Sequence, residues 1–460
     1  MGVGVSSWRL ARAVASAGQL GVVSGTALDG VFARRLQLGD PEGHLRRALE
    51  RFPYPAMAKR VLARWFVEGG KAQDAPFRPF AMPAVEPERD ALELTVIANF
   101  VEVCLAREGH ARPVGINYLE KIQAPTLASL YGALLAGVGC VVMGAGIPRA
   151  IPGVIDRLVR GEEARLALAV EGAPSGAHFE TRFDPRAFCG GAPPELARPA
   201  FLPIVASSTL AERLLRNPTG KIDGFVIEAP TAGGHNAPPR GGTQLDASGA
   251  PIYGERDQVD LECFRRSGLP FWLAGSRASP EQLALALAEG AAGIQVGTAF
   301  ALCDESGIAP ELRRRLLERV RAGAVRVRTD PRASPTGFPF KVVELAGTAG
   351  DRSVERERVC DLGYLRQAFV GPDGELNWRC PAEPEGAFVR KGGSLEDARD
   401  RLCICNGLFA TVGLGQVRGG RPEPALITAG DDLPSVARFL RPGASSYSAA
   451  DVVAALLARA

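Results

Sequence analysis

Several hallmarks of other protein classes are missing from this sequence of 460 residues. Lys and Arg (54) nearly balance Asp and Glu (51), which leaves a formal net charge of +3, and the two signs are mixed along the chain. Because this balance offers no basic surface to a phosphate backbone, we expect no nucleic-acid partner. The longest apolar stretch, residues 132–147, contains five glycines and is shorter than the roughly 20 residues of a membrane-spanning helix, so we expect no membrane span.

A secretory leader and a regular cysteine pattern are also missing. The nine cysteines are scattered, and the first residues do not combine positive charge, an apolar run and a small-residue cleavage site. These features are typical of a reducing compartment, so we expect a cytoplasmic protein without a disulfide scaffold. Glycine (54) and proline (35) are abundant but follow no period, which excludes collagen-like and repeat architectures.

Short β-branched runs alternate with amphipathic stretches, a pattern typical of parallel strands joined by crossover helices. Most of these runs end in Gly, Ala, Ser or Thr, which lets backbone amides approach a ligand at the carboxyl ends of the strands. We therefore expect an α/β fold, a (β/α)8 barrel of TIM type. The seven candidate strands are 20–25, 113–118, 138–143, 202–207, 223–228, 270–275 and 293–298.

The first strand of the barrel is missing from this pattern. Residues 1–6 resemble the glycine-rich loop that follows a strand, and residues 7–17 resemble the first helix, so we expect the chain to begin one strand late. A helical insertion is expected over 29–112 and a hairpin excursion over 161–200. The barrel then covers residues 1–330, and residues 331–460 form a cysteine-containing C-terminal extension packed on it.

One histidine stands at the mouth of a predicted strand. His235 follows the strand at 223–228 and comes directly after Gly233 and Gly234, and it is one of only four histidines in the chain. Neutral imidazole is suited to take a proton from a carbon acid near pH 7, and the glycines allow a ligand to approach the backbone. A structural histidine bonded to a carbonyl group is the alternative.

Two turns of small residues follow the last two predicted strands. The first contains Ala274, Gly275 and Ser276, and the second contains Gly297 and Thr298. In β/α barrels the loops after the seventh and eighth strands commonly hold a phosphate group through backbone N–H groups. Each turn alone is a weak signal, but their order after the glycine–histidine loop predicts a phosphate site.

Taken together, these motifs resemble the FMN-dependent nitronate monooxygenase family, formerly called 2-nitropropane dioxygenase, whose fold relatives include FMN-dependent enoyl-acyl-carrier-protein reductases. The resemblance spans roughly residues 1–305. It departs from the family in the missing first strand, in residues 236–241 after the histidine, and in the long C-terminal extension. The motifs are SAGQLGVV at 16–23, VGIN at 114–117, EA at 228–229 with AGGH at 232–235, WLAG at 272–275 and GAAGIQVGT at 290–298.

The resemblance implies FMN as cofactor, a small-molecule substrate, and oxidation of alkyl nitronates by O₂. His235 matches the catalytic histidine of the family and would act as the base. The flavin would supply the redox chemistry, and the protein would supply orientation and a dry pocket. The residues expected to hold the cofactor are Met1, Gly2, Asn117, Gly233 and Gly234 around the ring, and Ala274, Gly275, Ser276, Gly297 and Thr298 around the phosphate.

Two other functions stay open on this sequence. The first is an FMN-dependent enoyl-thioester reductase that takes electrons from NADH or NADPH; the absence of a Gly-x-Gly-x-x-Gly motif does not decide against it. The second is a barrel without redox chemistry that binds a phosphorylated metabolite. The sequence also leaves the oligomeric state open.

Four cysteines are concentrated near the C-terminus: Cys360, Cys380, Cys403 and Cys405. Four thiolates can hold zinc or an iron–sulfur cluster, but there is no Cys-x-x-Cys spacing here. On an extended strand, Cys403 and Cys405 would point to opposite faces. We therefore expect no metal site, with buried free thiols as the simpler interpretation and these four residues as the only metal-ligand candidates.

Overall fold

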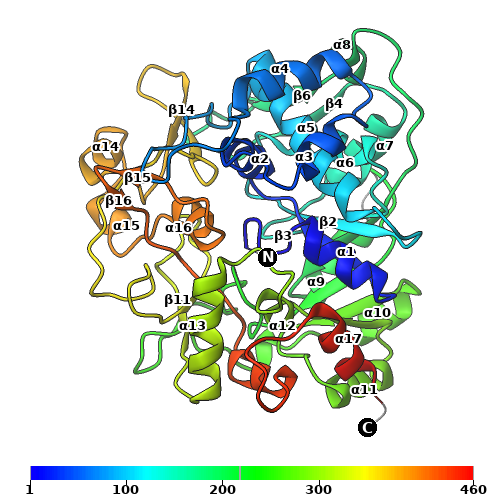
Figure 1. Ribbon diagram of the computed structural model, residues 1–460, viewed down its shortest axis with the longest axis vertical. Helices are drawn as coiled ribbons and strands as arrows, with labels where there is room; N and C mark the ends of the chain where they lie inside the picture. The colour runs from blue at the N-terminus through cyan, green and yellow to red at the C-terminus, as the bar shows by residue number, and fades with distance from the viewer. Residues whose placement is uncertain (1, 217–218, 459–460) are drawn as a thin grey trace.

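The computed structural model describes residues 2–216 and 219–458, and its centre is a parallel sheet of seven strands. The strands follow one another across the sheet in chain order, and each pairs in parallel with the next, so the sheet curls into a half-barrel (Figure 1). All seven predicted strands are confirmed. They are β1 (Gly21–Ser24), β2 (Val114–Leu119), β3 (Cys140–Gly144), β7 (Ala200–Val205), β8 (Phe225–Glu228), β9 (Phe271–Ala274) and β10 (Gly293–Gln295).

Helices connect these strands, and their ends follow the local sequence. The side chains of Ser207 and Ser279 accept the N–H groups of Leu210 and Gln282, which caps two of the helices at their first turn. Pro280 occupies the first position of the second of these helices, where its missing N–H costs nothing. α1 (Trp8–Ser16) precedes β1, and the helices between later strands are α6 (Thr126–Leu135), α7 (Ile151–Val159), α9 (Ser208–Leu215), α10 (Glu262–Ser267) and α11 (Pro280–Ala288).

The N-terminal segment lies where an eighth strand would stand. The Ser24 N–H donates to the Ser6 carbonyl at 2.8 Å, and the Ser6 hydroxyl donates to the Val22 carbonyl at 2.6 Å. On the other side, the Gly307 N–H donates to the Val5 carbonyl at 2.8 Å. Among the described residues the sheet therefore has seven strands and an irregular segment in place of an eighth, because residues 2–7 form turns rather than a ladder.

Both predicted excursions are present. The helical insertion contains α2 (Leu28–Gln37), α3 (His44–Leu49), α4 (Pro55–Trp65) and α5 (Arg89–Ala106), and α5 is buried over most of its surface because it packs against α1, α2 and α6. The second excursion contains an antiparallel pair, β4 (Ala164–Ala167) with β6 (Glu180–Phe183). It also contains β5 (Val170–Glu171) and α8 (Pro185–Cys189).

The C-terminal extension is continuous with the barrel. Leu408, Phe409 and Leu426 belong to the same buried core as the barrel strands, and β5 of the second excursion pairs with β13 of the extension. The last helix returns to pack against α1 and α11 (Figure 1). No helix of the described ranges is long and apolar enough to cross a membrane.

The remaining elements, from the 3₁₀ turn before α10 to the last helix, are η1 (Glu255–Asp257), α12 (Thr298–Ala301), α13 (Pro310–Arg321), β11 (Val327–Asp330), β12 (Phe340–Val343), β13 (Gln367–Val370), β14 (Leu376–Arg379), α14 (Glu385–Arg390), α15 (Leu395–Ala398), α16 (Ile404–Thr411), β15 (Val417–Arg418), β16 (Arg421–Pro422), η2 (Leu433–Phe439) and α17 (Ala449–Leu457).

The contact between α5 and α6 gives a test of this packing. A methyl group at Gly132 would overlap the carbonyl oxygen of Val96, so Gly132→Ala must push the two helices apart. We expect it to lower the free energy of unfolding by about 1–3 kcal/mol, although alanine favours a helix. Gly191→Ala, whose new methyl group meets no atom within 4 Å, is the matched control. Equal urea midpoints for the two variants would contradict the close packing.

Candidate functional site

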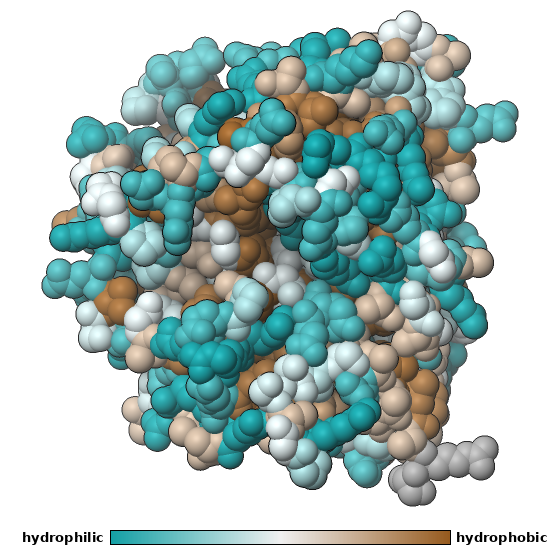
Figure 2. Space-filling model, in the orientation of Figure 1, coloured by the Kyte–Doolittle hydropathy of each residue, from teal (hydrophilic) through white to brown (hydrophobic). Residues whose placement is uncertain are grey.

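A cavity opens at the carboxyl ends of the parallel strands. The space there, counted together with the open solvent at its mouth, is about 880 Å³. Figure 2 shows apolar side chains in a hollow at the middle of one face. The cavity is lined by strand ends and loops of the half-barrel and by the C-terminal extension, which contributes Phe340, Tyr364, Leu365, Ile404, Cys405, Leu408, Phe409 and Thr428.

The glycine-rich loop after β8 brings His235 into the cavity wall. Gly234 has a φ of +85°, a left-handed conformation that a side chain would strain. The His235 Nε2 and the Ser334 hydroxyl are hydrogen-bonded at 2.7 Å, and the ring meets Phe340 edge-on with centroids 4.8 Å apart. Burial lowers the pKa of His235 to about 3, because the charged imidazolium loses its water. The side chain is therefore neutral near pH 7.

A carboxylic acid lies on the same wall. Glu228 is the last residue of β8 and lines the cavity that His235 also lines. Burial raises the pKa of Glu228 to about 7, since the carboxylate would lose its hydration. A group that titrates near neutral pH can both give and take a proton. The sequence analysis gave Glu228 no role of its own, because a single acidic residue at a strand end has many uses.

The residues predicted around a flavin ring converge. Gly2, Asn117, Gly233 and Gly234 all line this cavity, while Met1 lies outside the described residues. Thr26 lines it too, and the buried Thr26 hydroxyl has no hydrogen-bond partner in the described part of the chain. An unpaired buried hydroxyl costs stability unless a ligand satisfies it. Thr26 was missed at the sequence level, because a threonine after a strand is common in any loop.

The predicted phosphate turns do not line the cavity. Gly275 and Ser276 both have left-handed backbones, with φ of +98° and +53°, and the buried Ser276 hydroxyl has no partner among the described residues. A methyl group at Gly297 would meet no atom within 4 Å, so its backbone is open to a ligand. Ala274 is buried in a small apolar cluster with Val226 and Leu202.

A segment of the C-terminal extension, residues 428–432, packs on these turns. The Gly430 N–H donates to the Thr298 hydroxyl at 2.9 Å, so that predicted phosphate ligand already has a protein partner. The Gly234 N–H donates to the Thr428 hydroxyl at 2.8 Å. Lys341, which is almost fully buried, pairs with Asp431 at 2.7 Å. No feature of the sequence predicted this contact, because it joins residues that are about 130 and 190 positions apart.

The four C-terminal cysteines surround a second, smaller cavity. Cys403 precedes α16 and Cys405 lies in its first turn, so the two cysteines stand at the start of a helix and not on an extended strand. The reason is that residues 404–411 pack an apolar helical face into the main core. Within residues 2–216 and 219–458, no group of three His, Cys, Asp or Glu side chains is arranged to hold a metal ion.

Comparison with known proteins supports the sequence resemblance. A model of the nitronate monooxygenase family matches residues 196–331, the segment that carries β7 to β10, the glycine-rich loop with His235 and both turns. The predicted resemblance to this family of oxidoreductases is therefore confirmed. Among solved structures, FabK from Thermotoga maritima shares 14% identity over 99% of this chain and 89% of its own, with a TM-score of 0.47.

A second solved structure is similar to the same extent. Nitroalkane oxidase from Streptomyces ansochromogenes shares 17% identity over 100% of this chain and 93% of its own, with a TM-score of 0.49. A search of curated proteins found no match.

The raised pKa of Glu228 predicts a pH-dependent stability. Between pH 4.5 and about 7 the folded protein keeps a proton that the unfolded chain has released, so this group makes the free energy of unfolding fall as pH rises. Glu228→Gln removes this dependence. We expect the difference in free energy of unfolding, Glu228→Gln minus wild type, to increase with pH. The increase should reach up to about 1.4 kcal/mol per pH unit in this window.

Urea denaturation of both proteins at several pH values in this window measures the difference. The opposing titration of His235 is common to the two proteins and cancels. A difference that does not change with pH would show that Glu228 titrates at its ordinary value.

Proposed function

We propose that this protein is an FMN-dependent oxidoreductase of nitronate monooxygenase type, which oxidises small nitronates with O₂. One observation carries the proposal: His235, the two loop glycines and Asn117 meet at one cavity, and all but Asn117 lie in the segment that matches the family. FMN, when bound, supplies the redox chemistry.

The residues present fit FMN in three respects. The cavity has glycines and Asn117 along its wall where a planar ring needs close approach to the backbone. The buried hydroxyls of Thr26 and Ser276 have no hydrogen-bond partner among the described residues. Gly297 leaves open space above a strand end where phosphate is commonly held. In this assignment Gly2, Asn117, Gly233 and Gly234 hold the ring, while Gly275, Ser276, Gly297 and Thr298, with the backbone of Ala274, hold the phosphate.

His235 acts on the proton of the substrate. Because burial keeps the imidazole neutral, it is free to accept the α-proton of a nitroalkane. Burial also disfavours the imidazolium, so proton transfer needs an anion close by, and the nitronate that forms is such an anion. The apolar side chains of the extension exclude water from this step.

Replacing the histidine separates proton abstraction from the later steps. We expect His235→Asn to lower turnover of the neutral nitroalkane by at least about 100-fold and to change turnover of the preformed nitronate far less. Steady-state oxygen consumption with both substrate forms provides the measurement, and flavin content serves as a control for binding. Equal losses of turnover with the nitroalkane and with the nitronate would show that His235 is not the base.

The phosphate site is best tested at Gly297. A side chain at Gly275 would be strained by its φ of +98° and would crowd the Thr231 hydroxyl, whereas Gly297 has open space. We expect Gly297→Asp to reduce the flavin-to-protein ratio at least about tenfold, since a carboxylate would repel the phosphate. Gly297→Asn has the same bulk without the charge and is the matched control. Full flavin occupancy in Gly297→Asp would place the phosphate elsewhere.

A second candidate is reduction of an enoyl thioester with NADH or NADPH as electron donor. The observation that favours it is the protonated Glu228 beside an apolar wall that includes Leu365, Ile404 and Leu408, because reduction of a C=C bond requires a proton donor in a dry pocket. Anaerobic bleaching of the flavin by NADH or NADPH would support it. A colourless protein that rejects added FMN would leave instead a barrel without redox chemistry.

A further inference from the structure

The second cavity brings together all four C-terminal cysteines. Cysteines from three separate segments line one small space. Cys360 lies in the loop before β13, Cys380 directly follows β14, and Cys403 and Cys405 lie at the start of α16. The volume open to the centre of a water molecule is about 10 Å³, enough for about one water. An iron–sulfur cluster needs more room than this, and no three of the thiols are arranged around a metal ion.

Two of the four thiols influence each other's pKa. Both Cys360 and Cys380 line the small cavity, and the neighbouring Cys380 thiol lowers the pKa of Cys360 while the pKa of Cys380 is raised. The Arg366 guanidinium also lines the cavity and further favours the thiolate of Cys360. Cys360 is partly exposed, whereas Cys380 is buried. A partly exposed cysteine with a lowered pKa beside a buried partner thiol is the arrangement of an attacking and a resolving cysteine.

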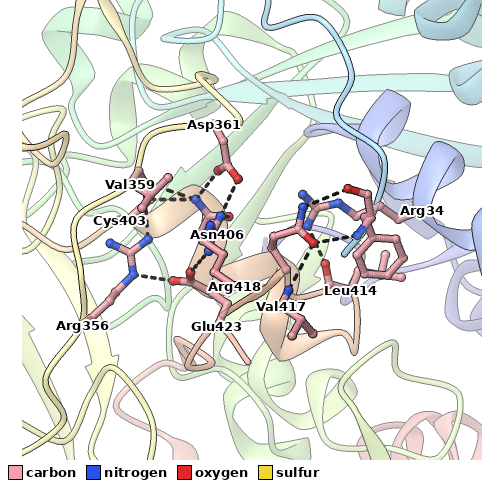
Figure 3. A network of polar contacts seen from close by, with 12 residues as sticks. Arg34, Arg356, Val359, Asp361, Cys403, Asn406, Leu414, Val417, Arg418 and Glu423 are labelled. Carbon is pink, nitrogen blue, oxygen red and sulfur yellow. Dashed lines mark hydrogen bonds and ion pairs between the residues drawn. The ribbon is translucent and has the colours of Figure 1, made fainter. Parts of the chain in front are cut away.

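Polar contacts hold the loop that carries Cys360 in place (Figure 3). The Cys403 thiol donates to the Val359 carbonyl at 3.7 Å, and Asn406 donates to the Asp361 carboxylate at 2.7 Å. Arg418 pairs with the same carboxylate. These contacts hold Val359 and Asp361, the two chain neighbours of Cys360. They also use the Cys403 thiol as a hydrogen-bonding group. Cys403 is thus already hydrogen-bonded, and burial raises the pKa of Cys405, which favours Cys360 with Cys380 as the reacting pair.

We propose that Cys360 and Cys380 form a modification site, a dithiol that a peroxide oxidises to a disulfide. The Cys360 thiolate attacks one oxygen of hydrogen peroxide and breaks the O–O bond, which with one proton gives a sulfenic acid and water. The Cys380 thiol then attacks that sulfur, so a second water leaves and the S–S bond forms. The two thiols lose two electrons in total, and the peroxide gains them.

Formation of the disulfide would affect the main cavity, because the two cavities share lining residues. Leu365, Ile404 and Cys405 line both cavities, so movement of the loop at Cys360 shifts side chains that line the main cavity. The oxidation itself does not depend on the proposed flavin chemistry, because the peroxide is supplied from outside.

Disulfide mapping on the full-length protein tests the site. Trypsin separates the cysteines, since Cys360 falls in peptide 359–366, Cys380 in 380–390, and Cys403 with Cys405 in 402–418. The folded protein is treated with dilute hydrogen peroxide, the remaining thiols are alkylated, and the peptides are identified by mass spectrometry. We expect peptides 359–366 and 380–390 to be joined, the nine titratable thiols to fall by two, and dithiothreitol to reverse both changes.

Serine variants identify the pair. Cys360→Ser and Cys380→Ser should each abolish the linked peptides, whereas Cys104→Ser, which lies outside both cavities, should keep them. If a variant fails to fold, as judged by circular dichroism, the mapping of the wild type still decides. The proposal is overturned if both cysteines stay singly alkylated, if either links to 402–418, or if metal analysis finds a stoichiometric ion that must be removed before the thiols react.

Discussion

The candidate site depends on one close contact, between the glycine-rich loop after β8 and residues 428–432. A Cβ atom at Gly233 would lie 2.8 Å from the backbone of Ala429, so only glycine allows the two segments to pack. This packing, the bond from Gly234 to Thr428 and the buried pair of Lys341 with Asp431 together fix where His235 enters the cavity wall. The barrel supplies the loop, but the extension determines its position.

Burial then gives the two titratable groups of the wall different properties. Glu228 and His235 face the same cavity, and loss of water disfavours the charged form of each, so one pKa rises and the other falls. Both groups are therefore neutral at slightly acidic pH although neither has a strong charge partner. A neutral acid beside a neutral base is an arrangement that suits proton transfer to and from carbon.

The local sequence predicted most of the half-barrel, because β-branched runs and capped helices encode their own structure. Every predicted strand formed within a few residues of its expected bounds, and Gly2, Asn117 and His235 reached a common cavity. The extension was unreadable for a physical reason. Its role rests on contacts across the chain, such as the bond from Gly430 to Thr298, and the helix that begins at Cys405 is held by the packing of its apolar face into the main core.

The short pairing of β5 with β13 has a consequence for how the protein matures. Val170 and Ala368 are register partners about 200 residues apart in the chain. During synthesis the strands of the half-barrel emerge long before β13, so the apolar ends of the sheet stay uncovered until the last third of the chain arrives. A nascent or truncated chain would thus present the unfinished cavity to solvent and to chaperones, and premature termination should yield aggregates rather than a smaller working barrel.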